Sequence, residues 1–270
     1  MARSINILGI VGSPHKDGMT HELVQQALAG ARAAGAETQI LYLADEPLQP
    51  CIGCGGNCWD TQACLHDDAA TTRAAQLQAA DGLVMAVPVY CWQLNGLTAL
   101  FIDKMRWDTG SVMAPHNTRA ALGMACAGGS GTGCVLALQA LYRYFYNWAF
   151  RGLPGLPVTR FNFRQSLADA RAGGEALAQM VREGAPAFSS VGAAMAHLDS
   201  LPYMRYGALD ELALIVEQLK AGLGEGQSPL QKTLWEEAAA AELALRQGDR
   251  ERAAEHLSRA YAAGNEAWES

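Results

Sequence analysis

The sequence lacks any long hydrophobic run. No stretch of its 270 residues approaches the roughly 20 apolar residues that a membrane-spanning helix needs. The first apolar run, residues 5–11, is short and leads directly into Gly12-Ser13-Pro14, without the long apolar region and small-residue cleavage site of a signal peptide. We therefore expect no membrane association and a cytoplasmic location.

Positive charge is also scarce. The chain has 20 Lys and Arg against 27 Asp and Glu, which gives a formal net charge of −7, and it has no basic cluster. Nucleic-acid binding needs lysines and arginines against phosphates, so we expect no nucleic-acid partner. Because disulfides are rare in the cytoplasm, the seven cysteines need another explanation.

What the sequence does contain is a regular alternation of short apolar runs and helical patterns. The predicted strands are residues 5–11, 38–43, 82–87, 120–125 and 158–161, and helical spacing over residues 20–34, 68–79, 94–106 and 135–150 separates them. This alternation predicts an α/β fold with a doubly wound five-stranded parallel sheet of order 2-1-3-4-5. In such folds the ligand lies at the carboxyl ends of the strands.

The character of the chain changes after about residue 166. Residues 166–185 and 207–223 have helical patterns, and residues 230–247 and 250–263 form a predicted helical hairpin that Gly248-Asp249 interrupts. We divide the chain into a ligand-binding domain, residues 1–185, and a C-terminal helical extension, residues 186–270. The extension is expected to cover the sheet or a partner subunit.

A candidate phosphate loop follows the first strand, at Gly12-Ser13-Pro14-His15-Lys16-Asp17-Gly18-Met19-Thr20. The N-terminus of a helix offers free N–H groups and a favourable dipole to an anion. The spacing fits neither a Walker A loop nor the Gly-x-Gly-x-x-Gly fingerprint, which counts against ATP hydrolysis and a Rossmann dinucleotide site. The alternative is an ordinary strand-to-helix turn.

The pattern Gly-Ser-Pro-x-Lys-x-Gly-x-Thr resembles the FMN-phosphate loop of the NADPH-dependent FMN reductase and iron–sulfur flavoprotein families. The resemblance covers about residues 4–165 and implies a flavodoxin-like fold. It implies that the FMN phosphate is held by Ser13, His15, Lys16, Gly18, Met19 and Thr20. Those families often have Asn at the position of Met19, where only the backbone N–H is available here.

Two further loops carry the resemblance. Pro88, Val89, Tyr90, Cys91 and Trp92 follow the third strand and resemble the family segment that forms an apolar wall for the flavin ring. Gly128, Gly129, Ser130 and Gly131 follow the fourth strand, where backbone N–H groups can reach flavin oxygens. The alternatives are aromatic side chains packed beneath a loop, and a flexible glycine-rich loop.

Four cysteines, Cys51, Cys54, Cys58 and Cys64, lie within 14 residues. Such a cluster is typical of metal binding. It resembles the cluster loop of iron–sulfur flavoproteins, with one extra residue between Cys54 and Cys58. A [4Fe–4S] cluster, a structural zinc ion, and thiols that hold no metal remain open as interpretations. We expect Cys91, Cys126 and Cys134 to be packing residues.

The sequence therefore predicts an FMN-dependent oxidoreductase. Electrons would arrive from NAD(P)H, or from ferredoxin through a cluster, and leave to a small acceptor such as a quinone. No acid or base is assigned. The alternatives are an iron–sulfur flavoprotein electron carrier without its own small substrate, and a flavodoxin-like scaffold that has lost FMN. The resemblance also implies a homodimer or homotetramer.

Overall fold

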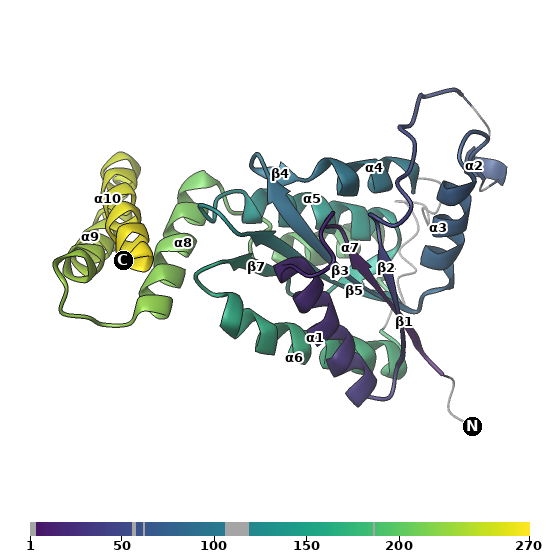
Figure 1. The fold of residues 1–270 in the computed structure, drawn as a ribbon, viewed down its shortest axis with the longest axis horizontal. Coiled ribbons are helices and arrows are strands. Elements are labelled where there is room, and N and C mark those ends of the chain that lie inside the picture. The colour runs from purple at the N-terminus through teal and green to yellow at the C-terminus, as the bar shows by residue number, and fades with distance from the viewer. Residues whose placement is uncertain (1–3, 56–57, 62, 106–118, 186) are drawn as a thin grey trace.

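A computed structural model describes residues 4–55, 58–61, 63–105, 119–185 and 187–270. Its centre is a parallel sheet built from β1 (Asn6–Val11), β2 (Glu37–Tyr42), β3 (Gly82–Tyr90), β5 (Arg119–Ala127) and the short β6 (Phe150–Gly152), in the order β2-β1-β3-β5-β6. β1 pairs in parallel with β2 on one side and with β3 on the other. β1, β3 and β5 are buried on both faces and are nearly continuous apolar runs, whereas the edge strand β2 is partly exposed. The predicted doubly wound sheet is confirmed (Figure 1).

The fifth strand position differs from the prediction because two short strands share it. β6 (Phe150–Gly152) and β7 (Leu156–Thr159) both pair in parallel with β5. Pro154-Gly155 lies between them, and a proline cannot donate a ladder hydrogen bond. The single strand that we predicted over residues 158–161 therefore begins earlier and is preceded by another segment.

The third strand is longer than predicted. It continues past residue 87 to Tyr90 and then reverses into the short antiparallel strand β4 (Gln93–Leu94). Tyr90 pairs with Gln93, so Cys91 and Trp92 form a two-residue turn between the strands. The sequence pattern for this hairpin is weak, because neither Cys91 nor Trp92 is a residue type that commonly forms two-residue turns.

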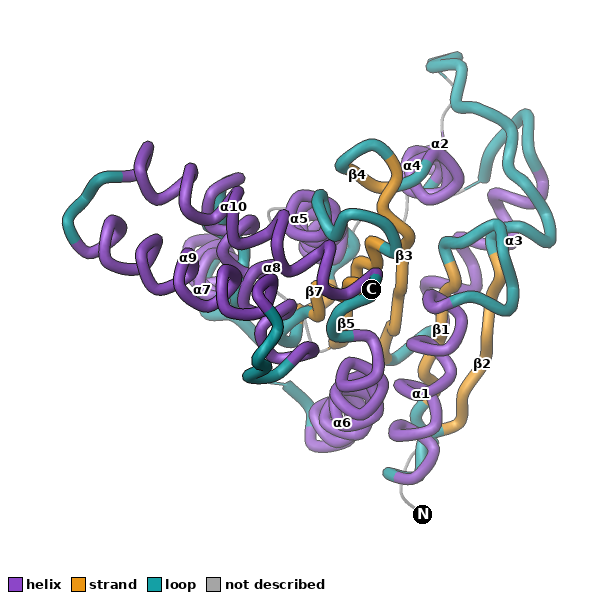
Figure 2. The backbone as a smooth tube through the Cα atoms, turned by 60° about the vertical axis from the view of Figure 1, so that its left-hand side comes forward, coloured by secondary structure: helices purple, strands orange, loops and turns teal. Residues whose placement is uncertain are grey.

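Helices cover both faces of the sheet (Figure 2). On one face, α1 (Met19–Ala33) and α6 (Phe163–Glu183) pack against each other closely: a Cβ at Gly174 would lie 1.8 Å from the Ala27 carbonyl oxygen. The other face is covered by α3 (Asp68–Ala79), α4 (Gly96–Lys104) and α5 (Cys134–Asn147), and α7 (Val191–Ser200) packs on α5. The predicted helix end at residue 106 lies outside the described residues. A four-residue helix, α2 (Cys58–Thr61), lies within the cysteine-rich segment.

The C-terminal helical extension is present and has a hydrophobic core of its own. Within residues 186–270, α7 packs on the sheet domain, and the separate core is formed by α8 (Ala208–Leu223), α9 (Pro229–Arg246) and α10 (Arg250–Glu269), with α9 and α10 forming the predicted hairpin. Leu219, Leu234 and Leu257 are at most 4% exposed, and Phe161 of the sheet domain joins their cluster. Figure 1 shows α8 between the sheet and the hairpin. Among the described residues, no helix combines the length and apolar character needed to cross a membrane.

Candidate functional site

The loop after β1 meets an uncapped N-terminus of α1. Gly18 is the N-cap residue, and no side chain accepts a hydrogen bond from the first turn of the helix. The first backbone N–H groups therefore lack partners within the helix. A Cβ at Gly18 would meet nothing within 4 Å, so the space in front of the helix is open. This end of α1 is suited to an anion.

The side chains of the same loop take different directions. Ser13 is 5% exposed, and its Oγ accepts a hydrogen bond of 3.0 Å from the His15 backbone N–H. His15 and Lys16 are exposed. The Lys16 ammonium group pairs with Asp45 and lies 5.3 Å from the centre of the Tyr42 ring. Lys16 is thus engaged with β2 and the loop that follows it.

Met19 and Thr20 connect the phosphate loop to the end of β5. Thr20 is 4% exposed, and its side chain is hydrogen-bonded to the Cys126 thiol. A Cβ at Gly128 would lie 3.6 Å from the Met19 sulfur. The start of α1 and the glycine-rich segment after β5 are therefore neighbours, as the shared carboxyl edge of the sheet predicts.

The β3–β4 hairpin presents an aromatic surface. Pro88 is buried within the sheet and Val89 is half-buried, whereas Tyr90 and Trp92 are 47% and 52% exposed. Cys91 and Trp92 have φ angles of 50° and 69°. Such left-handed conformations cost on the order of 1–3 kcal/mol each in residues other than glycine, and they cluster at ligand sites.

The loop after β5 touches this hairpin. Its exposed part comprises Gly128, Gly129 and Ser130, and it continues through the buried Gly131 and Gly133. A Cβ at Gly133 would lie 2.5 Å from the Cα of Trp92, and the φ of Gly133 is +91°. Only glycine satisfies both the close approach and the left-handed conformation. The three loops that the sequence singled out therefore meet at one edge of the sheet.

Sequence reasoning missed two residues at the start of α4. The Nδ2 of Asn95 donates to the Gly12 carbonyl oxygen at 2.9 Å, and the Thr98 hydroxyl donates to the same oxygen at 3.4 Å. Asn95 is 2% exposed, yet its Oδ1 has no partner among the described residues. An asparagine directly before a helix is a recognisable N-cap pattern, which could have drawn attention to it.

Two residues of the extension were also missed. Glu211 of α8 is 4% exposed and accepts a hydrogen bond of 2.7 Å from the Val135 N–H, in the first turn of α5. The Tyr261 hydroxyl of α10 donates to the Ser130 carbonyl oxygen at 3.0 Å. These contacts link residues 76 and 131 positions apart, so no local pattern reveals them.

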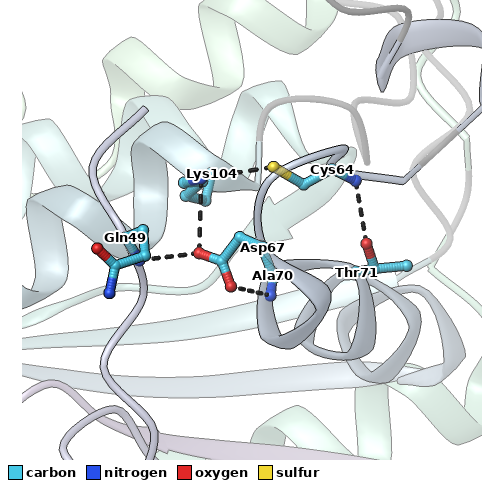
Figure 3. Close-up of polar contacts among 6 residues, drawn as sticks. All are labelled: Gln49, Cys64, Asp67, Ala70, Thr71 and Lys104. Carbon is cyan, nitrogen blue, oxygen red and sulfur yellow. Dashed lines mark hydrogen bonds and ion pairs between the residues drawn. The ribbon is translucent and has the colours of Figure 1, made fainter. Parts of the chain in front are cut away.

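The cysteine-rich segment is anchored where it ends (Figure 3). The Lys104 ammonium group, 3% exposed, lies 3.5 Å from Asp67 Oδ2 and donates to the Cys64 sulfur at 3.4 Å. Asp67 also accepts hydrogen bonds from the N–H groups of Ala70 and Gln49. A buried charge pair with these extra hydrogen bonds is satisfied electrostatically.

The predicted metal ligands are not assembled into a metal site. Cys51, Cys58 and Cys64 are half-buried and Cys54 is exposed. Within the described residues, no three Cys, His, Asp or Glu side chains come close enough to hold a metal ion. The four thiols have the donor chemistry of an iron–sulfur or zinc site, but their placement among the described residues does not have its geometry.

Two other cysteines lie beneath the glycine-rich loop. Burial raises the pKa of the Cys126 thiol to about 12, although the hydrogen bond with Thr20 opposes the shift. Burial also raises the pKa of Cys134, which donates to the Val158 carbonyl oxygen at 3.1 Å. Both thiols stay protonated at neutral pH, which agrees with a packing role. Cys91, which we also expected to be a packing residue, is instead exposed, because it lies in the turn between β3 and β4.

Comparison with known proteins places this site in a family. The model of the NADPH-dependent FMN reductase family matches residues 5–155, which is more than half of the chain. The chain belongs to that family. Membership supports FMN as the cofactor and oxidoreduction as the type of chemistry, and it agrees with the resemblance inferred from the three loops.

Curated relatives carry a more specific name. An iron–sulfur flavoprotein of Methanocaldococcus jannaschii is 33% identical over 102 residues, which are 38% of this chain and 52% of the relative. An iron–sulfur flavoprotein of Methanosarcina thermophila is 36% identical over 86 residues, which are 32% of this chain and 44% of the relative. The chain thus spans about half the length of the curated relatives it matches.

Among solved structures, an NAD(P)H:quinone oxidoreductase from Methanothermobacter marburgensis superimposes with a TM-score of 0.50 and 13% identity. The match covers 65% of this chain and all of the other. RosB, solved with a bound flavin-phosphate intermediate, gives a TM-score of 0.51 at 14% identity, over 67% of this chain and 81% of the other. At these identities the matches show the flavodoxin-like fold alone.

The residues of this FMN reductase family member fit FMN chemically. The uncapped end of α1 suits a phosphate, and the exposed Tyr90 and Trp92 suit a flat apolar ring. The buried Asn95 Oδ1 lacks a donor among the described residues, beside the end of β1. A buried acceptor without a partner costs about 1–3 kcal/mol, which a ligand hydroxyl could recover.

Proposed function

We propose that this chain is an FMN-dependent oxidoreductase that passes electrons from NAD(P)H to a small acceptor such as a quinone. The observation that carries the proposal is the meeting of three loops at one sheet edge, which the Gly133–Trp92 contact and the Met19–Gly128 proximity establish. FMN, when bound, takes up and gives back an electron pair. The protein supplies binding, orientation and exclusion of water.

The roles of the site residues follow from their contacts. Ser13, His15, Lys16, Gly18, Met19 and Thr20 are the proposed phosphate ligands. Among these candidates, the backbone N–H groups at the start of α1 are the best placed to bind the phosphate. The side chains of Lys16 and Thr20 are already paired, with Asp45 and Cys126 respectively. Tyr90 and Trp92 are the proposed wall for the flavin ring. Gly128, Gly129, Ser130 and Gly131 are the proposed backbone donors to the ring oxygens.

The cysteine loop supports a second candidate function. The curated relatives are named iron–sulfur flavoproteins, and this chain has four thiols within 14 residues. A [4Fe–4S] cluster on Cys51, Cys54, Cys58 and Cys64, reduced by ferredoxin, would make the chain an electron carrier. Since the thiols are not assembled in the structure, this proposal requires the loop to close around the metal.

The proposal also includes a cellular location and an oligomeric state. Seven cysteines outside disulfides favour the reducing cytoplasm. A homodimer or homotetramer is proposed because the exposed Tyr90 and Trp92 leave the flavin wall open on one side, which a second subunit would close.

The test is an oxygen-free assay of the FMN-loaded protein. NADH or NADPH is offered with a soluble quinone, and nucleotide consumption is followed while iron and acid-labile sulfide are measured on the same sample. Quinone-dependent oxidation of either nucleotide supports the reductase. A protein that binds FMN and about four irons, ignores both nucleotides and accepts electrons from reduced ferredoxin supports the carrier.

A further inference from the structure

The glycine-rich loop is held from outside by the C-terminal extension. The N-cap of α5, Gly133, has no side chain, and the first turn of α5 contains no acidic residue. The Glu211 carboxylate of α8 fills this role by accepting a 2.7 Å hydrogen bond from the Val135 N–H. A buried carboxylate at a helix N-terminus is stabilised by the helix dipole as well as by the hydrogen bond.

Tyr261 of α10 holds the other end of the loop. Its hydroxyl donates to the Ser130 carbonyl oxygen at 3.0 Å. The chain has no cis peptide bond among the described residues, so the Gly131 N–H points opposite to that carbonyl and away from α10. Gly131 is closely surrounded, since a Cβ added there would lie 3.1 Å from Thr159 and 3.4 Å from Ile215.

The helices that make these contacts are themselves fixed to the end of the sheet. Gln218 of α8 donates to the Pro157 carbonyl oxygen at 3.2 Å and accepts from the Thr159 hydroxyl at 2.7 Å. Arg160, directly after β7, donates to Asn265 at 2.6 Å and to Glu269 at 2.7 Å in α10. Figure 2 shows the C-terminus of α10 near the loops at the ends of β5 and β7. The extension therefore acts as a rigid support.

From these contacts we propose that Tyr261 and Glu211 are positioning residues of the flavin site. They fix the peptide units of residues 130–135 so that the loop N–H groups are ready to bind the flavin ring. The proposal rests on the proposed FMN function. The C-terminal helical extension, which lies beyond the residues matched by the family model, is then part of the cofactor site.

The physical consequence is a change in both affinity and redox potential. Without Tyr261, the Ser130–Gly131 peptide can rotate, and the loop must be ordered when FMN binds. A neutral hydrogen bond contributes about 0.5–1.5 kcal/mol, which corresponds to a weakening of FMN binding by roughly two- to thirteenfold. Donors to the ring oxygens stabilise the electron-rich reduced flavin more than the oxidised one, so their misplacement lowers the midpoint potential.

The experiment compares Tyr261→Phe and Glu211→Gln with Glu237→Gln. The control variant weakens a contact within the extension, the 2.6 Å hydrogen bond between His256 and Glu237 of α9, because a neutral amide replaces the carboxylate, and it does not touch the loop. For each full-length protein, amide hydrogen exchange at residues 130–135 is measured without FMN. FMN affinity and the flavin midpoint potential are then measured on the same preparations.

The expected result is faster exchange at residues 130–135, weaker FMN binding and a more negative potential for Tyr261→Phe and Glu211→Gln, with all three unchanged in Glu237→Gln. Unchanged exchange and potential in both test variants would overturn the proposal, as would equal effects in the control. If the unmodified protein takes up no FMN, the proposed function fails, whereas the exchange measurement still decides whether the extension orders the loop.

Discussion

The glycine-rich loop and the cysteine-rich loop are held in opposite ways. Residues 128–135 are fixed by Trp92 of the hairpin, Glu211 of α8 and Tyr261 of α10. The cysteine-rich loop is anchored at its end, where Lys104 contacts both Cys64 and Asp67, while Cys54 is exposed. The first loop is therefore preorganised, whereas the anchor that the described residues show for the second lies at its end.

This difference bears on function. A preorganised loop binds a cofactor without an ordering cost, which is how a resident flavin is held at low concentration. A loop that closes only around its ligand couples metal binding to local folding.

Thiol reactivity should separate the two loops most strongly. Burial raises the pKa of Cys126 to about 12, so at pH 8 its thiolate is roughly a thousandfold scarcer than that of an ordinary thiol. In metal-free folded protein we expect iodoacetamide to modify the exposed Cys54 at least about a hundredfold faster than Cys126. Peptide mass spectrometry over time measures both rates. Equal rates would mean that the end of β5 is not packed as described.

Removing the buried ammonium group of Lys104 should destabilise the protein at the anchored end of the cysteine-rich loop. Lys104→Met leaves the 6%-exposed Asp67 side chain without its ion pair, and breaking a buried pair costs about 3 kcal/mol of unfolding free energy. Urea denaturation measures the change. The double variant Lys104→Met/Asp67→Asn should regain part of the loss. A single variant as stable as the unmodified protein would show that the pair is solvated.

Adding a methyl group should disturb the glycine-rich loop. Gly133→Ala places a Cβ 2.5 Å from the Trp92 Cα at a φ of +91°, and we expect a loss of about 2 kcal/mol and FMN binding weakened more than tenfold. Gly129→Ala is the matched control, since nothing lies within 4 Å of its added Cβ. It should change stability by less than about 0.5 kcal/mol. Comparable losses of stability in the two variants would argue against the contact between Gly133 and the hairpin.

The smallest expected effect is a pH dependence within the extension. The hydrogen bond with His256, together with Arg259, lowers the pKa of Glu237 below its usual value. The stabilisation is therefore present above the unfolded pKa of about 4.5 and is lost as the pH falls through the lower folded value. Because solvent screens the pair, Glu237→Gln should cost only about 0.5 kcal/mol at pH 6. That difference should shrink as the pH falls below about 4.5 toward the lower folded pKa. A difference that stays constant over this range would assign it to packing.

The sequence predicted those parts of the molecule that depend on local pattern. The strands, the doubly wound order and the helical hairpin follow from apolar periodicity, and the three loops follow from their positions after strands. The turn at Cys91-Trp92 was not predictable, because neither residue favours positive φ and the contact with Gly133 is what selects it. The split of the fifth strand was visible only as Pro154-Gly155.

The residues that hold the two loops in place could not be predicted from the sequence, for a different physical reason. Glu211, Tyr261 and Lys104 act through buried tertiary contacts with residues distant in sequence. In sequence they are one acidic, one aromatic and one basic residue among many on helical patterns. The assignments of the FMN-contacting residues, and the domain boundary at residues 185 and 186, remain predictions.

The most direct test of the account is an FMN titration of the flavin-free full-length protein, followed by flavin fluorescence and the visible absorption spectrum. We expect saturable binding of one FMN per chain, with a spectrum changed from that of free flavin by the aromatic wall and the loop. A protein that keeps its helical circular dichroism but leaves the FMN signal unchanged at every concentration would contradict the account and favour a flavin-free scaffold.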